Sequence, residues 1–188
     1  MLTLSRNKLI AYVLIVLWLG CLIAALWWFK GRYVKSFTEQ AVVFSSQGLQ
    51  LPKALSGPGP IRLVHFWDPK CPCNTGNQQH LADLMQHFSE EVRFYAVQKP
   101  NTRGQLPKQL SELNVLESFP GAEQIPSTPA VGIWDQHGQL AYFGPYSAGL
   151  TCNSSNSFIE PILKALKEQR SVSVDNSLAV GCFCQWQE

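Results

Sequence analysis

The segment Ile61–Phe88 reads IRLVHFWDPKCPCNTGNQQHLADLMQHF. Its first seven residues are mainly apolar and have the length of a buried strand. Further along, apolar residues recur at the spacing of one helix face: Leu81, Leu84, Met85 and Phe88. Two cysteines, Cys71 and Cys73, therefore lie on the turn between a predicted strand and a predicted helix.

This position favours a thiolate. The first amides of a helix have no partner within the helix, and the aligned peptide dipoles favour negative charge there. The dipole alone supplies roughly 0.3–1 kcal/mol. One pKa unit corresponds to about 1.4 kcal/mol, so a reactive cysteine also needs direct amide hydrogen bonds or a cation such as Lys70.

The stretch Phe66-Trp67-Asp68-Pro69-Lys70-Cys71-Pro72-Cys73 resembles the F-W-A-x-W-C-G-P-C pattern of the thioredoxin superfamily. Two departures are Lys70, where an aromatic residue is common, and the single residue between the cysteines. The resemblance implies an α/β thioredoxin-like fold, a central mixed sheet flanked by helices. It also implies that Cys71 is the attacking thiolate and Cys73 its resolving partner.

Two more catalytic candidates follow from the same resemblance. His65 replaces the buried carboxylate that the family has just before F-W, so it is a candidate proton acceptor for the second cysteine. A histidine on a buried strand is also an ordinary core residue. Pro129 falls where the family keeps a cis-proline beside the cysteines, although trans is the default for a bond to proline.

The remaining elements are predicted from their apolar patterns. Strands are expected over residues 92–97, 130–134 and 139–143, and helices over 106–119 and 158–169, the last with a capping box of Ser157 and Glu160. The order becomes β-α-β-α-β-β-α, which is the thioredoxin arrangement. A short helix is also expected over 36–44.

Residues 9–29 contain no charge and are long enough, at about 30 Å, to cross a bilayer core. The run ends in Trp27, Trp28 and Phe29, unlike a cleaved signal peptide. We therefore expect a retained transmembrane anchor. Cys21 is expected to be an ordinary small residue of that helix. Basic residues flank both ends, so positive charge does not determine the orientation.

The chain is expected to consist of an anchor (1–35), a connector (36–60), a thioredoxin-like domain (61–170) and a tail (171–188). The tail contains a second C-x-C, Cys182-Phe183-Cys184. With this tail, residues 60–188 resemble an uncharacterised family of bacterial membrane-anchored thioredoxin-like proteins. The segment from residue 170 to 182 can extend about 40 Å, so the tail can fold back to the first cysteine pair.

Outside the anchor lie five cysteines, so at least one is unpaired or has a partner elsewhere. Pro72 favours an extended Cys71, which predicts a strained Cys71–Cys73 bond. The competing pairing joins Cys71 or Cys73 to Cys152 or to the tail. In a thioredoxin-like fold Cys152 is expected near Cys71. Cys152, Cys182 and Cys184 are thus candidate auxiliary thiols.

Three functions remain open. The first is a membrane-tethered thiol–disulfide oxidoreductase, with protein thiols or a redox protein as partner and no cofactor. It is expected in the inner (cytoplasmic) membrane with its soluble domain in the periplasm. The second is a copper- or zinc-binding module, with Cys71, Cys73, Cys152, Cys182 and Cys184 as ligands. The third is a non-catalytic domain stapled by disulfides.

Composition narrows the list of partners. The net charge is only +2, and no basic stripe is present. A nucleic-acid partner is therefore not expected. The substrate and the direction of electron transfer do not follow from the sequence.

Overall fold

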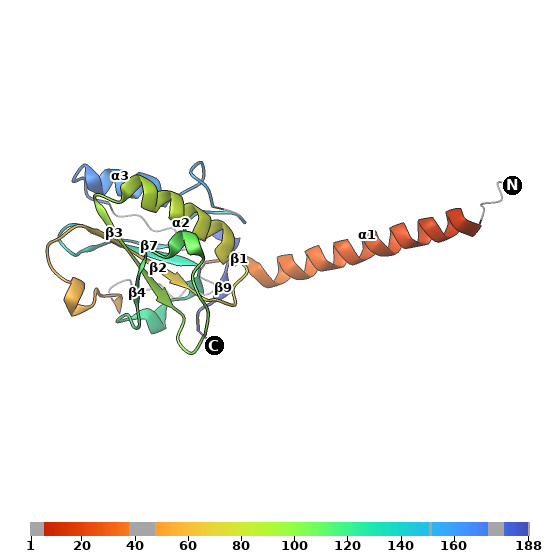
Figure 1. Cartoon of the computed structure of the whole chain (residues 1–188), viewed down its shortest axis with the longest axis horizontal. Coiled ribbons are helices and arrows are strands. Elements are labelled where there is room, and N and C mark those ends of the chain that lie inside the picture. Colours follow the sequence, from red (N-terminus) through yellow and green to blue (C-terminus); the bar gives the residue numbers. More distant parts are fainter. Residues whose placement is uncertain (1–5, 38–47, 151, 173–178, 188) are drawn as a thin grey trace.

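The computed structural model describes residues 6–37, 48–150, 152–172 and 179–187. One long helix extends away from a domain in which helices pack on a sheet (Figure 1). The α-helices are α1 (Arg6–Tyr33), α2 (Asn74–Phe88) and α3 (Ile159–Lys167), and 3-10 turns span Lys53–Leu55, Lys108–Leu110 and Ala122–Gln124. The strands are β1 (Val34–Ser36), β2 (Ile61–Trp67), β3 (Val92–Gln98), β4 (Asn114–Leu116), β5 (Ser127–Thr128), β6 (Ala130–Trp134), β7 (Leu140–Gly144), β8 (Val180–Cys182) and β9 (Cys184–Gln185).

The five-stranded main sheet has the order β4-β3-β2-β6-β7. β2 is central and all seven of its residues are buried. It pairs in parallel with β3, which follows across α2, and antiparallel with β6. A strand that is covered on both faces needs apolar residues at nearly every position, which explains the continuous apolar run seen in the sequence.

Each face of the sheet has its own core. Ile61, Leu63 and Trp67 of β2 pack with α2 and α3, which lie on the same face (Figure 1). Val64 and Phe66 point to the opposite face, because side chains alternate along a strand. Loops and the C-terminal tail cover that second face, with these buried residues: Phe37, Leu49, Phe119, Ile125, Phe183 and Trp186.

The helix expected over residues 106–119 is wrong. The structure has a short 3-10 turn at Lys108–Leu110 and then the edge strand β4, which pairs in parallel with β3. Leu110 and Leu113 are buried as a helix would require, but Val115 is 64% exposed. The leucine spacing fitted a helix, whereas the free edge of β3 offers backbone hydrogen bonds that stabilise a strand.

Other boundaries differ only in detail. The last helix begins at Ile159, and Ser157 Oγ accepts hydrogen bonds from the Ile159 and Glu160 amides at 3.0 and 3.4 Å. The short helix expected over 36–44 falls mostly within residues 38–47, outside the described residues. Its first residue, Ser36, is the end of β1.

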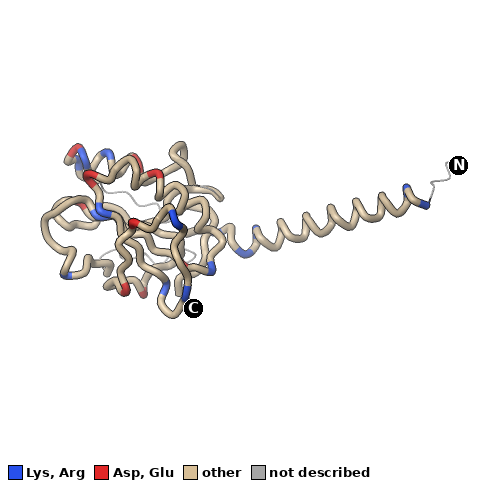
Figure 2. The backbone as a smooth tube through the Cα atoms, in the orientation of Figure 1, with Lys and Arg blue, Asp and Glu red and all other residues tan. Residues whose placement is uncertain are grey.

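The anchor helix α1 is long and apolar enough to cross a membrane. None of its residues is buried by the rest of the protein. Figure 2 shows charged residues only toward its two ends. Its C-terminal end leads directly into β1, which pairs antiparallel with β8 of the tail. The C-terminal end of α1 is therefore connected to the tail through the β1–β8 pair.

Candidate functional site: two C-x-C segments joined by disulfides

Asp68 fixes the turn that carries the first cysteine pair. Its carbonyl oxygen accepts hydrogen bonds from the Cys71 amide at 2.9 Å and from Asn74 Nδ2 at 2.6 Å. Its carboxylate accepts one from the Lys70 amide at 2.9 Å. This local bonding holds residues 68–74 in a tight turn after β2, as Asp favours when it precedes such a turn.

The turn places both cysteines at the start of α2. Cys73 directly precedes the first helical residue, and its carbonyl accepts a hydrogen bond from Asn77 Nδ2 at 2.8 Å. Cys71 and Cys73 are 4% and 5% exposed. The predicted strand-to-helix junction is confirmed, and both cysteines lie at the N-terminal end of α2, where the helix dipole favours negative charge.

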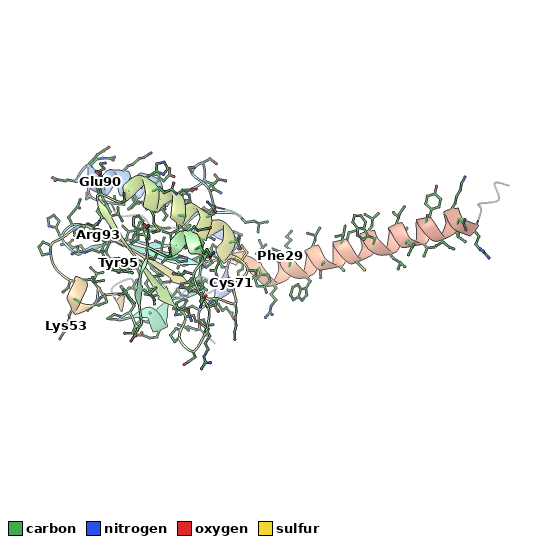
Figure 3. The ribbon with its side chains drawn as sticks, viewed as in Figure 1. Phe29, Lys53, Cys71, Glu90, Arg93 and Tyr95 are labelled. Atoms are coloured by element: carbon green, nitrogen blue, oxygen red, sulfur yellow. A yellow bond between two sulfur atoms is a disulfide. The ribbon has the colours of Figure 1, made fainter. Side chains whose placement is uncertain are left out.

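Each of these cysteines forms a disulfide with the tail. Cys71 is bonded to Cys184 and Cys73 to Cys182, with Cα–Cα distances of 5.9 and 5.5 Å. The alternative Cys71–Cys73 bond is absent. The hypothesis that the tail folds back to the first C-x-C is confirmed. Phe29 and Tyr33 of α1 pack against this cysteine cluster, as the position of Phe29 beside Cys71 in Figure 3 shows.

The tail also pairs with the backbone next to Pro129. The Thr128–Pro129 bond is cis, as the resemblance implied. Strand β9 runs antiparallel to β5, with Thr128 opposite Cys184. Cys71 Sγ lies 3.8 Å from the Thr128 carbonyl oxygen. A disulfide sulfur has no hydrogen to donate, so this is a packing contact in the oxidised protein.

Apolar side chains hold the tail independently of the bridges. Phe183 and Trp186 are each 3% exposed and belong to the core on the second face of the sheet. The Phe183 ring meets Phe37 edge-on, and the Trp186 ring meets Phe66 in the same way. Burial of such side chains stabilises the docked tail by a few kcal/mol.

Lys99 connects the turn to the tail. Its ammonium lies 3.6 Å from the Asp68 carboxylate and donates a hydrogen bond to the Gln185 carbonyl at 3.2 Å. Its backbone amide donates to the Trp67 carbonyl at 2.8 Å. A cation therefore lies on the loop after β3, close to both segments that carry the cysteines.

His65 is fully buried on β2 and its ring bonds to Tyr146. The Tyr146 hydroxyl lies 2.8 Å from His65 Nδ1, while Nε2 has no hydrogen-bond partner among the described residues. Burial lowers the pKa of His65 from 6.5 to about 3. Such a histidine is neutral at pH 7 and a weak proton acceptor. Its proposed role toward Cys73 stays a prediction.

Cys152 lies apart from the four disulfide-bonded cysteines. It is a buried free thiol that packs in the main core with residues such as Tyr146, and it does not join the cysteine cluster. The expected packing near Cys71 is therefore not observed, because the Cys152 side chain belongs to the core that contains α2 and α3 and not to the cysteine cluster. Burial raises the pKa of Cys152 to about 11, so it remains a protonated thiol at neutral pH.

A groove of about 1180 Å³ lies beside the cysteine site, along the C-terminal half of α1 from Gly20 to Tyr33. Cys71 and Cys184 line it, so the Cys71–Cys184 bond is the outer bridge and Cys73–Cys182 the inner one. Cys184 is only partly buried. The opposite wall includes Trp27 and Trp28 of α1 together with cations. The lysine and arginine residues that line the groove are Arg32, Lys35, Lys70 and Lys99.

In the described residues, the side chains that gather closely enough to hold a metal are those of Cys71, Cys73 and Cys184. Asp68 and Lys99 were not identified from the sequence. Asp68-Pro69 is a turn signal that indicates the role of Asp68. Lys99 has no such signal, because its approach to the site depends on the parallel pairing of β3 with β2.

The strand order, the cysteines at the start of α2 and the adjacent cis-proline define the chain as a thioredoxin-like protein. Residues 40–186 match the family described as "Domain of unknown function (DUF6436)", and the chain belongs to that family. No curated protein is significantly similar in sequence.

Similar solved structures include three with the following similarities to this chain. An uncharacterized conserved protein from Geobacillus kaustophilus is 18% identical, with 84% of this chain and 88% of that chain covered and a TM-score of 0.55. A hypothetical protein from Sinorhizobium meliloti 1021 is 15% identical, with 68% and 79% covered and a TM-score of 0.50. A putative thiol:disulfide interchange protein DsbE from Chlorobium tepidum is 14% identical, with 63% and 96% covered and a TM-score of 0.48. At these identities the similarity extends to the fold alone.

Proposed function

We propose that this protein is a membrane-tethered thiol–disulfide oxidoreductase in which the tail occupies the substrate position. The observation that carries the proposal is the placement of Cys184. Cys184 lies on a strand paired antiparallel with β5, opposite the residue before the cis-proline, and is disulfide-bonded to Cys71. A mixed disulfide between an attacking cysteine and a bound peptide has the same covalent form.

The first exchange step starts at the outer bridge. Cys184 is the more accessible sulfur, because Cys71 is 4% exposed whereas Cys184 is only partly buried. A substrate thiolate attacks Cys184 Sγ, the Cys71–Cys184 bond breaks, and Cys71 leaves as a thiolate stabilised by the start of α2. A second substrate thiolate then attacks the sulfur of the first substrate cysteine. The substrate gains a disulfide, and Cys184 is released as a thiol.

The inner bridge supplies the second oxidising equivalent. The sulfur atoms of Cys71, Cys73 and Cys184 lie within 4.8 Å of one another. The Cys71 thiolate attacks Cys73 Sγ, forms a Cys71–Cys73 bond and releases Cys182 as a thiolate. The remaining disulfide is thereby moved to the first C-x-C, where it oxidises a second dithiol. One chain oxidises two dithiols before an external oxidant must restore it.

The proposed setting is the periplasmic side of the inner membrane. An oxidising compartment preserves the two bridges between substrate cycles. The groove that exposes the outer bridge is bounded by the aromatic end of the anchor. The partner thiols therefore approach close to the lipid headgroups, where Trp and Tyr residues concentrate.

The test measures oxidising equivalents on the full-length protein in detergent. The protein is mixed without oxygen with a reduced peptide that has two cysteines, and free thiols are counted by alkylation and mass. We expect two peptide disulfides per chain and a transient peptide adduct on Cys184. The Cys71→Ser/Cys184→Ser variant retains only the inner bridge and loses the adduct. The matched control, Cys152→Ser, alters a free cysteine of the core and leaves both results unchanged.

A static role for the bridges predicts the opposite result. Both disulfides would then survive a large excess of peptide dithiol in the folded protein and open only after unfolding in urea. That outcome would reject the oxidoreductase and leave the stapled-domain interpretation.

A further inference from the structure

The two C-x-C segments are held together by more than their disulfides. β8 pairs with β1 over three residue pairs, β9 pairs with β5, and Phe183 and Trp186 are buried in the core. None of these contacts involves a sulfur–sulfur bond. We therefore expect the tail to remain docked after both bridges are reduced, so that the four sulfur atoms remain close to one another.

The two disulfides gather four sulfur atoms in one place. Cys71 is bonded to Cys184 and Cys73 to Cys182, and the sulfurs of Cys71, Cys73 and Cys184 all lie within 4.8 Å of one another. A tetrahedral thiolate site with Zn–S bonds of about 2.3 Å has sulfur atoms about 3.8 Å apart. Shifts on the scale of side-chain rotations bring the four sulfurs to that arrangement.

The surroundings compensate the charge that such a site would carry. Four thiolates leave a net charge of −2 around Zn²⁺ and −3 around Cu⁺. Cys71 and Cys73 lie at the N-terminal end of α2, where the helix dipole favours negative charge. The Lys99 ammonium reaches the tail at the Gln185 carbonyl but also faces the Asp68 carboxylate at 3.6 Å. Further positive charge comes from Lys70 and Arg32, which line the adjoining groove.

We propose that the fully reduced protein binds one thiophilic d10 metal ion, Zn²⁺ or Cu⁺, through the thiolates of Cys71, Cys73, Cys182 and Cys184. Soft thiolate ligands select these ions. This inference rests on the proposed function in one respect, because both proposals require the two disulfide bridges to open in the folded protein. A dithiol or phosphine reductant supplies two electrons to each disulfide, two protons are taken up per bridge, and the metal displaces the protons from the resulting thiols.

Cys152 has no place in this site, although it was a candidate ligand in the sequence. It belongs to the core under α2 and α3, and burial raises the pKa of its thiol to about 11. A ligand cysteine must lose its proton, so Cys152 is a poor ligand and a suitable control.

The experiment uses the full-length protein in detergent, reduced with a phosphine under argon. Zn²⁺ and Cu⁺ are added in separate samples, and the metal retained after desalting is measured by native mass spectrometry and elemental analysis. Co²⁺ is a spectroscopic substitute that reports tetrahedral thiolate ligation by visible absorption. Free thiols are counted in the same samples, so failure of the bridges to open is distinguished from failure to bind metal.

We expect one ion per reduced chain and none per oxidised chain. Cys184→Ala, which removes one of the three adjoining sulfurs, abolishes retention, whereas Cys152→Ser and Cys21→Ser retain one ion. A second negative control is wild-type protein that is reduced and then alkylated at Cys71, Cys73, Cys182 and Cys184. This control does not depend on the folding of a variant. Two free thiols, Cys21 and Cys152, are present before reduction, so six are counted once both bridges are open. The proposal is overturned if six free thiols are counted but no Zn²⁺ or Cu⁺ is retained, or if the alkylated protein retains as much metal as the reduced one.

Discussion

His65 shows how burial changes the chemistry of one residue. It stands where the thioredoxin pattern has a buried carboxylate, yet its Nδ1 bonds to Tyr146 and burial lowers its pKa to about 3. A neutral imidazole with so low a pKa accepts protons poorly at pH 7. Its clearest effect is therefore on stability in acid.

We predict that the protein loses stability as the pH falls from 6.5 toward 3. Below pH 6.5 His65 in the unfolded chain binds a proton, whereas the folded protein excludes it until about pH 3. At pH 4 the difference of about 2.5 units corresponds to about 3 kcal/mol in the free energy of unfolding. Urea titrations at pH 7 and pH 4 measure this loss.

The matched variants are His65→Asn and His137→Asn. His137 lies exposed in the turn after β6. His65→Asn reduces the difference between pH 7 and pH 4, and His137→Asn leaves it as in the wild type. An equal pH dependence in all three proteins would refute the assignment to His65.

Most helices and strands could be predicted wherever the apolar pattern was compatible with only one type of secondary structure. β2, β3, β6, β7, α2 and α3 follow from apolar runs and periodicity, and the site turn follows from Asp68-Pro69 and the cysteines. β4 was missed because leucine spacing gave no sign of the free edge of β3. The pairing of Cys71 with Cys184 was also undecided, since spacing limits how far a tail reaches but not which sulfur it meets.

The 3-10 turn and the edge strand β4 that follows it give a prediction about burial. Leu110→Ala should destabilise the protein by about 2–5 kcal/mol, because Leu110 is fully buried. Val115→Ala should change stability by less than about 0.5 kcal/mol, because Val115 is 64% exposed. Denaturant unfolding of both variants measures the two losses, and similar losses would contradict the observed difference in burial.

The tail element gives a second prediction. Trp186→Ala removes a side chain that is 3% exposed and meets Phe66, which should cost about 3–5 kcal/mol of docking energy. With the bridges intact, the tail stays attached. After reduction, limited proteolysis should release the tail of Trp186→Ala much faster than that of the wild type.

Val180→Ala is the control for the tail, since Val180 is 53% exposed and precedes the cysteine pair. It should be cut at the wild-type rate after reduction. If wild-type protein loses its tail as readily as Trp186→Ala, the bridges alone hold the tail, and the four-sulfur metal site loses its structural basis.

At the scale of the whole molecule, α1 determines where the cysteine site lies. α1 continues into β1, β1 pairs with β8, and Phe29 and Tyr33 pack on the cysteine cluster. The cysteine site is thereby fixed at the end of a helix long and apolar enough to span a bilayer.

We predict that the protein remains in the membrane fraction after carbonate washing and that both bridges are present in cells quenched with acid. A membrane-impermeant alkylating reagent should label Cys184 only after external reduction. Cys21, within the apolar part of α1, should resist that reagent and serves as the internal control. If Cys71, Cys73, Cys182 and Cys184 are all found as free thiols in quenched cells, the domain lies in a reducing compartment. That result would contradict the proposed topology.

The bridges join residues 113 and 109 positions apart. A ribosome completes Cys71 and Cys73 long before it reaches Cys182 and Cys184, and in the proposed topology the four reach the oxidising compartment in that same order. During that interval the earlier pair must persist as thiols or in a temporary bond with each other. The native connectivity is therefore a late, post-translational event, and a cell whose thiol oxidation is too rapid or too indiscriminate will accumulate wrongly joined precursors of this protein.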